Sequence, residues 1–216
     1  MSLQQYNQKR KFDKTPEPTG GKPTDNKLHF VVQKHHASHL HYDFRLELKG
    51  ILKSWAVPKG LSMNSSDSRL AMLVEDHPWD YRNFEGIIPS GYGAGTVIVW
   101  DEGAYETTEI KEKNKKAQEH SVMSQFWKGQ IKFTLHGHKL KGAFQMVRAK
   151  DKGDNAWYVI KLEDKYASKE DVTKNDKSVL SKITLEQVAA DPEREWQSHK
   201  PGKKEKTVTA GEIDKR

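Results

Sequence analysis

The sequence predicts a mainly β protein: a small antiparallel β-barrel with one or two short helices and extended polar tails. Apolar and polar residues alternate through several short segments between residues 28 and 165, and this period of two is typical of strands with one face in a core. Turn-forming residues separate the segments at short intervals, and residues 28–106 show no helical period of useful length. Many short strands joined in this way favour an antiparallel sheet or a small barrel.

The predicted elements follow one another from residue 28 onward. The first strands are LHFVVQ, LHYDFRLEL, SWAVP, RLAMLVED and TVIVWDEGAYE. Residues 107–128 are charged and then mildly amphipathic, which predicts a helix. Three further strands are QIKFTLHG, KLKGAFQMVRA and AWYVIKLED, with the turn candidates HGHK and DKGDN between them. TLEQVAA at 184–190 predicts a second, short helix.

The chain divides into three predicted regions. Residues 1–27 are polar and carry prolines and a Gly-Gly pair, which predicts an extended basic N-terminal arm. Residues 28–165 form the barrel domain. Residues 166–216 are rich in Lys, Asp, Glu and Ser, and we expect them to be a polar linker or disordered tail.

Composition restricts the class of protein and of partner. Hydrophobic residues make up 34% of the 216 and charged residues 31%, so we expect a modest core. The formal net charge of +7 favours a polyanionic partner, although charge alone also serves solubility. The chain has no cysteine, which excludes disulfides, thiolate zinc sites and cysteine nucleophiles. It shows neither a secretory signal nor an apolar run of the roughly 20 residues that a membrane span needs. We therefore expect a cytoplasmic protein without a membrane partner.

The segment HLHYDFRLEL, residues 39–48, alternates strictly between ionisable and apolar side chains. The ionisable side of the predicted strand carries His39, His41, Asp43, Arg45 and Glu47. One interpretation is a solvated face, because any half-buried strand shows this alternation. However, histidine and aspartate are also nitrogen and oxygen ligands that suit manganese, zinc or iron.

A metal site is the sharper interpretation of this face. His41 and Asp43 are two positions apart on one strand and can both face a single ion. His35 or His36, at the end of the preceding strand, is the nearest source of a third ligand, and three protein ligands leave positions for water or substrate. Arg45 would stand beside the ion, where a bridging phosphate could use its forked donors. The face therefore indicates phosphoryl chemistry.

A second polar cluster occupies VEDHPWDYRNFEG, residues 74–86. It can be a polar loop held down by its Trp and Phe, or it can supply His77 as a phosphate donor or general acid and Tyr81 as a hydroxyl donor. The following IPSGYGAGTVIVW carries glycines before a strand rather than a helix. That order favours a tight turn over a dinucleotide-binding loop.

Several of these segments together resemble one known family. QKHHASHLHYDFRLE, SWAVPKG, EDHPWDYRNFEG, PSGYGAGTVIVWD, KLKGAFQMVR and WYVIKLED are similar, in the same order, to the phosphoesterase domain of bacterial DNA ligase D. The resemblance covers roughly residues 5–165. It implies a β-barrel whose interior and mouth hold the site, and a manganese-dependent enzyme for which other divalent transition metals could substitute. It also implies 3′-end processing in non-homologous end joining: removal of a 3′-terminal ribonucleotide and then of the remaining 3′-phosphate.

The resemblance assigns residues position by position. The implied metal ligands are His35, His41 and Asp43. The implied catalytic residues are Arg45, His77, Glu75 and Tyr81. The implied substrate-binding residues are Gln33, Lys59, Arg69, Arg10 and Glu17. His36 and His39 fall where the family tolerates other residues. The chain departs from the family at Lys11, where an acidic residue is expected, with Asp13 nearby; this departure concerns the arm's contribution to the monoesterase step.

The resemblance also suggests partners and alternatives. We expect DNA or DNA/RNA primer–template 3′ ends as substrates, ligase and polymerase modules in cis or in trans, the end-binding protein Ku, and a location at the nucleoid. A covalent nucleotidyl ligase would need a Lys-x-Asp-Gly motif, which this sequence lacks. The alternative from another class is a non-catalytic nucleic-acid-binding adaptor module of a DNA repair ligase.

Overall fold

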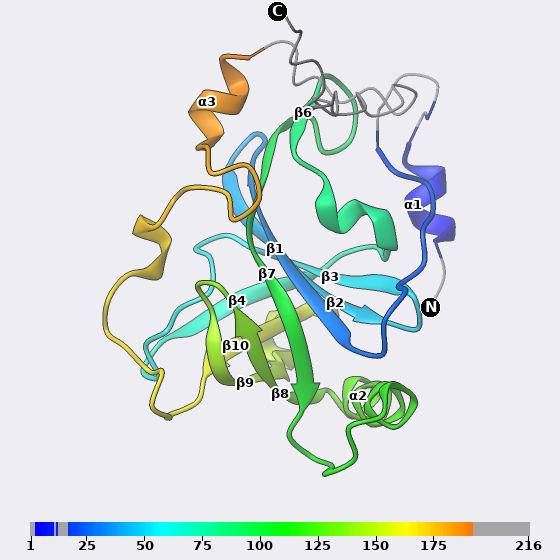
Figure 1. The fold of residues 1–216 in the computed structure, drawn as a ribbon, viewed down its shortest axis with the longest axis vertical. Helices are drawn as coiled ribbons and strands as arrows, with labels where there is room; N and C mark the ends of the chain where they lie inside the picture. The colour runs from blue at the N-terminus through cyan, green and yellow to red at the C-terminus, as the bar shows by residue number, and fades with distance from the viewer. Residues whose placement is uncertain (1–2, 11, 13–16, 192–216) are drawn as a thin grey trace, which may run out of the picture.

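The computed structural model of the protein describes residues 3–10, 12 and 17–191. Its central feature is a closed barrel of eight antiparallel strands (Figure 1). The strand order is β1-β2-β3-β4-β10-β9-β8-β7, and β7 pairs back onto β1 to close the barrel. The predicted fold class is confirmed.

Each predicted strand segment overlaps one of the barrel strands. These are β1 (Leu28–His36), β2 (Leu40–Leu48), β3 (Ile51–Val57), β4 (Ser68–Leu73), β7 (Gly95–Thr107), β8 (Gln130–Gly137), β9 (Lys141–Arg148) and β10 (Ala156–Lys161). Two short strands pair outside the ring: β5 (His77–Pro78) with β3, and β6 (Gly86–Ile88) with β7.

The helices are short, and two lie where the sequence predicts them. α2 (Lys115–Lys128) begins at Asn114, whose side chain accepts a hydrogen bond from the Ala117 N–H, and ends at Gly129 with φ of 81°. α3 (Leu185–Ala189) begins with a capping box formed by Thr184 and Gln187. The remaining helical turns are α1 (Gln4–Gln8), η1 (Trp79–Asn83), η2 (Lys150–Lys152) and η3 (Val172–Lys174).

The barrel interior is an aromatic core. Phe44 of β2 stacks on Phe133 of β8 across the barrel, with ring centroids 5.9 Å apart, although these strands are not neighbours. Phe126 of α2 stacks on Trp157 with centroids 5.5 Å apart, so the helix closes one end of the barrel, at the bottom of Figure 1. The predicted apolar side of residues 40–48 therefore faces inward.

A second apolar cluster covers the outer face of β1, β3 and β7. Side chains from α1, η1 and β6 pack there against the barrel wall. Its members are Tyr6, Val31, Leu52, Trp79, Tyr81, Phe84, Ile88, Val97 and Val99. One part of the barrel wall is thus buried on both sides. The outward-facing polar residues of β1, β2 and β3 therefore lie beneath these packed segments.

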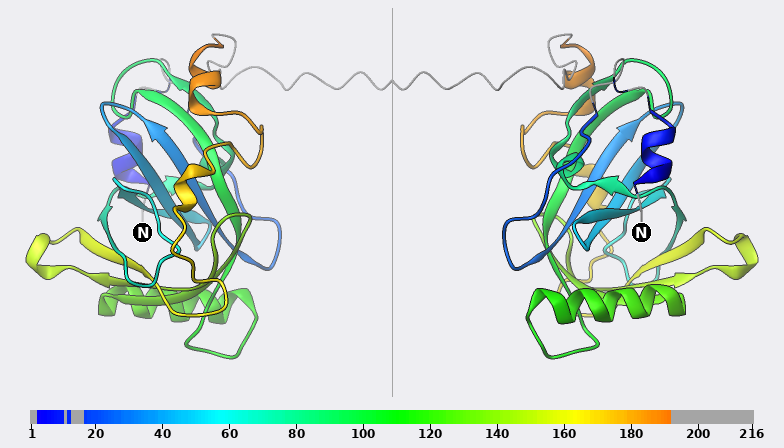
Figure 2. Two further views of the ribbon diagram at one scale, coloured as in Figure 1. Left: turned by 90° about the vertical axis from the view of Figure 1, so that its left-hand side faces the viewer. Right: turned by 90° about the vertical axis from the view of Figure 1, so that its right-hand side faces the viewer.

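Parts of the predicted arm and tail pack against the barrel. In the arm, α1 buries Tyr6 completely. In the tail, residues 162–178 form a strap along the barrel that leads to α3, as Figure 2 shows. Trp100 Nε1 donates to the carbonyl oxygen of Asn175 at 2.7 Å, and Leu185 and Val188 are buried. Isolated anchors of this kind leave no apolar period in the sequence. Residues 192–216 of the predicted linker lie outside the described residues.

In the described part of the chain, no helix is both long enough and apolar enough to cross a bilayer.

The aromatic core yields a stability prediction. Phe44→Ala should lower the free energy of unfolding by about 3–5 kcal/mol, because it removes a ring from a closed interior that cannot collapse around the cavity. Trp127→Ala, at a side chain that is 67% exposed, should cost about 0.5 kcal/mol or less. Urea denaturation followed by circular dichroism measures both values. Equal losses for the two variants would contradict the assignment of Phe44 to the interior.

Candidate metal and phosphate site

The polar residues of β1 and β2 gather on the outside of the barrel wall. The antiparallel register sets His35 opposite His41 and Gln33 opposite Asp43. Since the alternate residues of β2 pack in the interior, His41 and Asp43 point outward, toward the covering segments. The interior that the resemblance implied as part of the site is filled with aromatic rings, so that expectation is corrected here.

His35, His41 and Asp43 converge at one point. Each offers a ligand atom, and these atoms all lie within 4.8 Å of one another. His35 Nδ1 is 3.5 Å and His41 Nε2 is 3.8 Å from Asp43 Oδ2. The structure thus selects His35 over His36, which is exposed and leaves the strand on the other side.

Two details of the imidazoles fit this cluster to a divalent metal. His41 Nδ1 lies 3.0 Å from the carbonyl oxygen of His39 and donates to it, which directs the lone pair of Nε2 toward Asp43. A backbone carbonyl behind the ring is the usual outer partner of a metal-binding histidine. His35 Nε2 is buried and has no hydrogen-bond partner in the described part of the chain. Two nitrogens and a carboxylate suit manganese, zinc or iron.

The charge of Asp43 is stabilised by its neighbours. Burial alone would raise the pKa of this carboxyl group, but Arg45, His35 and His41 outweigh that effect and hold the pKa well below its usual range. Arg45 Nη2 lies 3.2 Å from Asp43 Oδ2. Asp43 is therefore ionised at neutral pH, as a metal ligand must be.

Arg45 is held rigidly beside the cluster. Its Nε donates to Gln33 Oε1 at 2.8 Å and its Nη1 to Ser54 Oγ at 2.9 Å. Gln33 in turn donates to the carbonyl oxygens of Tyr81 and Phe84 at 2.9 and 3.0 Å. A guanidinium has about five N–H donors, and the contacts with Gln33, Ser54 and Asp43 use only part of them. Gln33, predicted to bind substrate, is fully buried and orients Arg45 instead.

His77 lies on the far side of Ser54 from Arg45. Its Nδ1 is 2.9 Å from the carbonyl oxygen of Glu75, which can only accept, so Nδ1 carries the proton. Its Nε2 lies 3.3 Å from Arg10 Nη2 and accepts from it. Burial, together with the charges of Arg45 and Arg10, lowers the pKa of His77 well below 6.5. The imidazole is therefore neutral and, in this arrangement, is not a donor to phosphate.

The predicted arm residues form a buried ionic network next to His77. Arg10 Nε donates to Glu17 Oε1 at 2.8 Å, and Arg10 Nη1 donates to Glu75 Oε1 at 3.0 Å. Tyr81 donates its hydroxyl hydrogen to Glu17 Oε1 at 3.0 Å, and burial together with Glu17 raises the pKa of Tyr81 well above 10. These hydrogen bonds connect the arm to His77 and so to the residues next to the cluster. The departure at Lys11 and the nearby Asp13 lie outside the described residues.

The other two predicted substrate-binding residues come from the turn after β3 and from β4. Lys59 is exposed in the turn after β3, at the end where β2 begins, because Tyr42 pairs with Val57. Arg69 is on β4, where its Nη2 lies 2.8 Å from Asp67 Oδ2. Arg69 pairs with Val159 of β10, and β3 separates its strand from β2.

Two contributors were not singled out from the sequence. Ser54 contacts both Arg45 and His77, at 2.9 and 3.3 Å, and its outward position on β3 follows from the alternation with Trp55. Tyr6 donates to the carbonyl oxygen of Pro18 at 2.6 Å, and its ring packs edge-on to His77 at 5.1 Å. Its only signal in the sequence was that it is one of two aromatic residues, with Phe12, in a polar arm.

Comparison with known proteins places these features in context. A family model described as "DNA Ligase D 3′-phosphoesterase domain" matches residues 33–148. "Multifunctional non-homologous end joining protein LigD" of Pseudomonas aeruginosa is 45% identical over 192 residues, which are 85% of this chain and 22% of the relative. The "multifunctional non-homologous end joining DNA repair protein LigD" of Mycobacterium tuberculosis is 44% identical over 149 residues, 68% of this chain and 18% of the relative. The chain spans about a fifth of the length of these relatives.

Burial of a neutral His77 predicts a pH dependence of stability. Below about pH 6.5 the unfolded chain gains a proton at this position and the folded chain does not, because the folded pKa is lowered. The free energy of unfolding should therefore fall with decreasing pH, by up to about 1.4 kcal/mol per pH unit from this group. Above that pH, the contribution of neutral His77 to the free energy of unfolding is fully present and no longer changes. Urea denaturation of the wild type and of His77→Gln on both sides of this pH measures it; the variant should show a flatter profile, and parallel profiles would refute it.

Proposed function

This chain belongs to the DNA ligase D 3′-phosphoesterase domain family, and we propose that it hydrolyses phosphate esters at the 3′ ends of nucleic-acid strands. The reaction would remove a 3′-terminal ribonucleotide and then the remaining 3′-phosphate, as a step of non-homologous end joining. The observation that carries the proposal is the convergence of His35, His41 and Asp43 within 4.8 Å, beside the buried Arg45.

A divalent metal, with manganese our first choice, would be held by His35, His41 and Asp43. When bound, such a metal polarises a phosphate oxygen and makes a bound water more acidic. The unpartnered Nε2 of His35 and the carbonyl behind His41 support this assignment. Histidine and carboxylate ligands do not exclude zinc or iron, so the metal is compared directly in the assay below.

Arg45 would bind the phosphate and stabilise charge that develops on it. Its orientation is set before substrate arrives by Gln33, Ser54 and Asp43, so no reorganisation is needed during the reaction. Neutral His77 would hold Arg10 in place through Nε2 and would contact phosphate only after gaining a proton. This role differs from the phosphate donor or general acid that the sequence suggested.

The nucleophile would be water or the substrate's neighbouring 2′-hydroxyl. Ser54 is the hydroxyl nearest Arg45, but it donates to the carbonyl oxygen of Leu52 at 3.0 Å and accepts from Arg45. No general base within hydrogen-bond distance activates it among the described residues, because His77 Nδ1 is protonated. Direct attack without a covalent enzyme intermediate is therefore the route we propose.

The substrates and partners follow from the family and the charge. We expect DNA or DNA/RNA primer–template 3′ ends as substrates, and a net charge of +7 supports a polyanion. Ligase and polymerase modules, in cis or in trans, and Ku are the partners proposed for a chain that matches about a fifth of its multifunctional relatives. The alternative function is a non-catalytic nucleic-acid-binding adaptor, for which the same cluster would be structural.

Loss of a ligand should abolish both 3′ activities. Asp43→Ala should lower the rate of manganese-dependent release of the terminal nucleoside by more than about a hundredfold, because even outer partners of metal ligands are worth about 10–100-fold. The assay uses a primer–template with a single 3′-ribonucleotide, with manganese, zinc and iron supplied separately. A second substrate ending in a 3′-phosphate reports the monoesterase step.

His39→Ala is the matched control for this experiment. His39 is two residues from His41 but lies in the bend before β2, where it is exposed and outside the cluster. Only its backbone carbonyl contacts His41, so the substitution should leave both activities unchanged. Circular dichroism should show that both variants are folded. Wild-type turnover by Asp43→Ala would overturn the ligand assignment, and binding without product at any metal concentration would favour the adaptor.

A further inference from the structure

The glycine-rich segment between β6 and β7 forms a loop whose base lies beside the proposed metal site. At this base Ile88 pairs with Gly95, where β7 begins. A Cβ at Gly95 would lie 2.3 Å from the carbonyl oxygen of His36, the residue after His35. The base of the loop therefore lies against the end of β1, and the loop joins β6 to β7 at the top of Figure 1.

The tip of the loop is a tight turn that presents Tyr92. The Ala94 N–H donates to the carbonyl oxygen of Gly91 at 3.2 Å, and Gly93, the third residue of the turn, has φ of 82°. A type II turn requires a positive φ at this position, where residues other than glycine are strained. The tight turn that the sequence predicted is thus present, and its second residue is Tyr92, whose side chain is 52% exposed.

Tyr92 contacts the N-terminal arm. Lys9 Nζ lies 4.5 Å and Arg10 Cζ lies 5.7 Å from the centroid of its ring. The face of an aromatic ring attracts cations within about 6 Å. Both cations also contact Glu75, with Lys9 Nζ 3.1 Å from Oε2 and Arg10 Nη1 3.0 Å from Oε1. The loop and the arm are therefore joined where the arm meets Glu75.

The arm depends on such contacts because its helix is very short. α1 has five residues and no side-chain cap at its N-terminus, and a helix of this length is not stable by itself. Tyr6 holds it from the core: this ring is fully buried and its centroid lies 4.0 Å from Arg10 Cζ. Arg10 thus has one tyrosine ring beside it from the core and a second, Tyr92, from the loop.

The position of Arg10 matters for the site because its guanidinium joins three buried groups. Nε donates to Glu17 and Nη1 to Glu75, while Nη2 lies 3.3 Å from His77 Nε2. If the arm moved away, His77 would lose this partner and the buried Glu75 would lose a cation. A contact that keeps the arm docked therefore also fixes His77.

We propose that Tyr92 is a positioning residue of the site: from the loop it holds Lys9 and Arg10, and so keeps the arm docked against His77. Tyr92 acts through Arg10 rather than on the substrate. The effect on turnover rests on the proposed function, whereas the effect on the arm does not.

The first measurement is amide hydrogen exchange of residues 4–10, which needs no turnover. The Lys9 N–H donates to the carbonyl oxygen of Gln5 at 3.2 Å, and exchange of this amide reports local opening of the arm. Tyr92→Leu keeps an apolar side chain but removes the ring, so exchange should become about fivefold faster, the ratio expected for one exposed cation–π contact. Tyr92→Phe keeps the ring and should exchange at the wild-type rate.

The second measurement is manganese-dependent release of the terminal nucleoside from the 3′-ribonucleotide primer–template. Tyr92→Leu should lower kcat about tenfold, because Arg10 and His77 are then less well placed. KM for the primer–template should change by less than about twofold, because no contact with the strand is removed. Tyr92→Phe should restore kcat.

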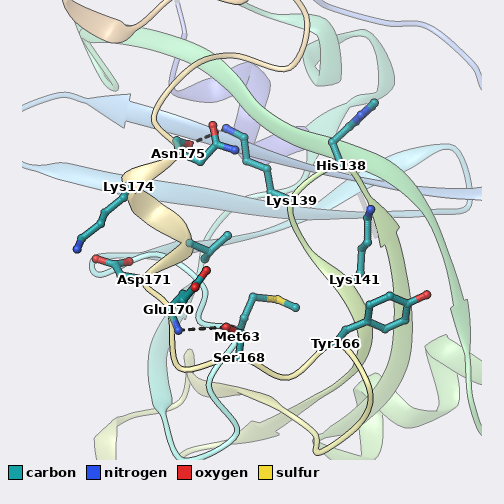
Figure 3. A pocket seen from close by; sticks show the side chains of 11 residues that line it. Met63, His138, Lys139, Lys141, Tyr166, Ser168, Glu170, Asp171, Lys174 and Asn175 are labelled. Atoms are coloured by element: carbon teal, nitrogen blue, oxygen red, sulfur yellow. Dashed lines mark hydrogen bonds between the residues drawn. The ribbon is translucent and has the colours of Figure 1, made fainter.

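Tyr166 supplies the matched control. It lies on the strap, in the wall of the cavity that Figure 3 shows; its side chain is 42% exposed, and Lys165 Nζ lies 5.1 Å from its ring. A Cβ at Gly142 would lie 2.9 Å from Tyr166 Cδ2, which places this ring beside β9, and β9 pairs with neither β1 nor β2. Tyr166→Leu also removes an exposed tyrosine with a lysine over its ring, and it should change neither arm exchange nor turnover.

The outcomes separate this inference from the proposed function. Wild-type exchange in Tyr92→Leu, or equal losses in Tyr92→Leu and Tyr92→Phe, would overturn the role of the ring in holding the arm. A raised KM with unchanged arm exchange would mean that Tyr92 contacts the substrate, which also overturns the proposal. Faster exchange in Tyr92→Leu alone, in a protein whose wild type shows no turnover, would refute the proposed function and leave the contact between Tyr92 and the arm standing.

Discussion

The buried guanidinium of Arg45 is the group around which the rest of the site is organised. It is almost fully buried and contacts Asp43, Gln33 and Ser54 at once. A buried cation is destabilising without such partners, so these residues contribute to the stability of the barrel. Through Asp43 it reaches the proposed metal ligands, and through Ser54 it reaches His77.

The cover over the barrel wall makes this burial possible. The segment from Glu75 to Ile88 and the described part of the arm cover the outer face of β1, β3 and β7, with Tyr6 and Phe84 as apolar anchors. Exclusion of water strengthens every charge interaction beneath the cover. The same burial keeps His77 neutral and Tyr81 protonated, while His41 at the edge stays partly exposed.

Much of the fold and part of the candidate site could be predicted from the sequence. Alternation located every barrel strand, and a mildly amphipathic pattern located α2, because these are local properties of the chain. The pairing of His41 with Asp43 on one strand face is also local. By contrast, α1 and the strap depend on single anchors such as Tyr6 and Trp100, and no window of sequence shows what an isolated side chain will contact.

Local alternation in the chain establishes which residues share a strand face, but what each face packs against is a property of the closed barrel. A period of two reports two sides of a strand but not which side is concave, and here both are buried, one by aromatic rings and one by Tyr81 and its neighbours. The choice of His35 over His36, the proton on Nδ1 of His77 and the role of Gln33 as a support for Arg45 all arise from contacts between segments far apart in the chain. Such contacts form only when the barrel closes, because pairing and burial bring these atoms together and sequence spacing does not.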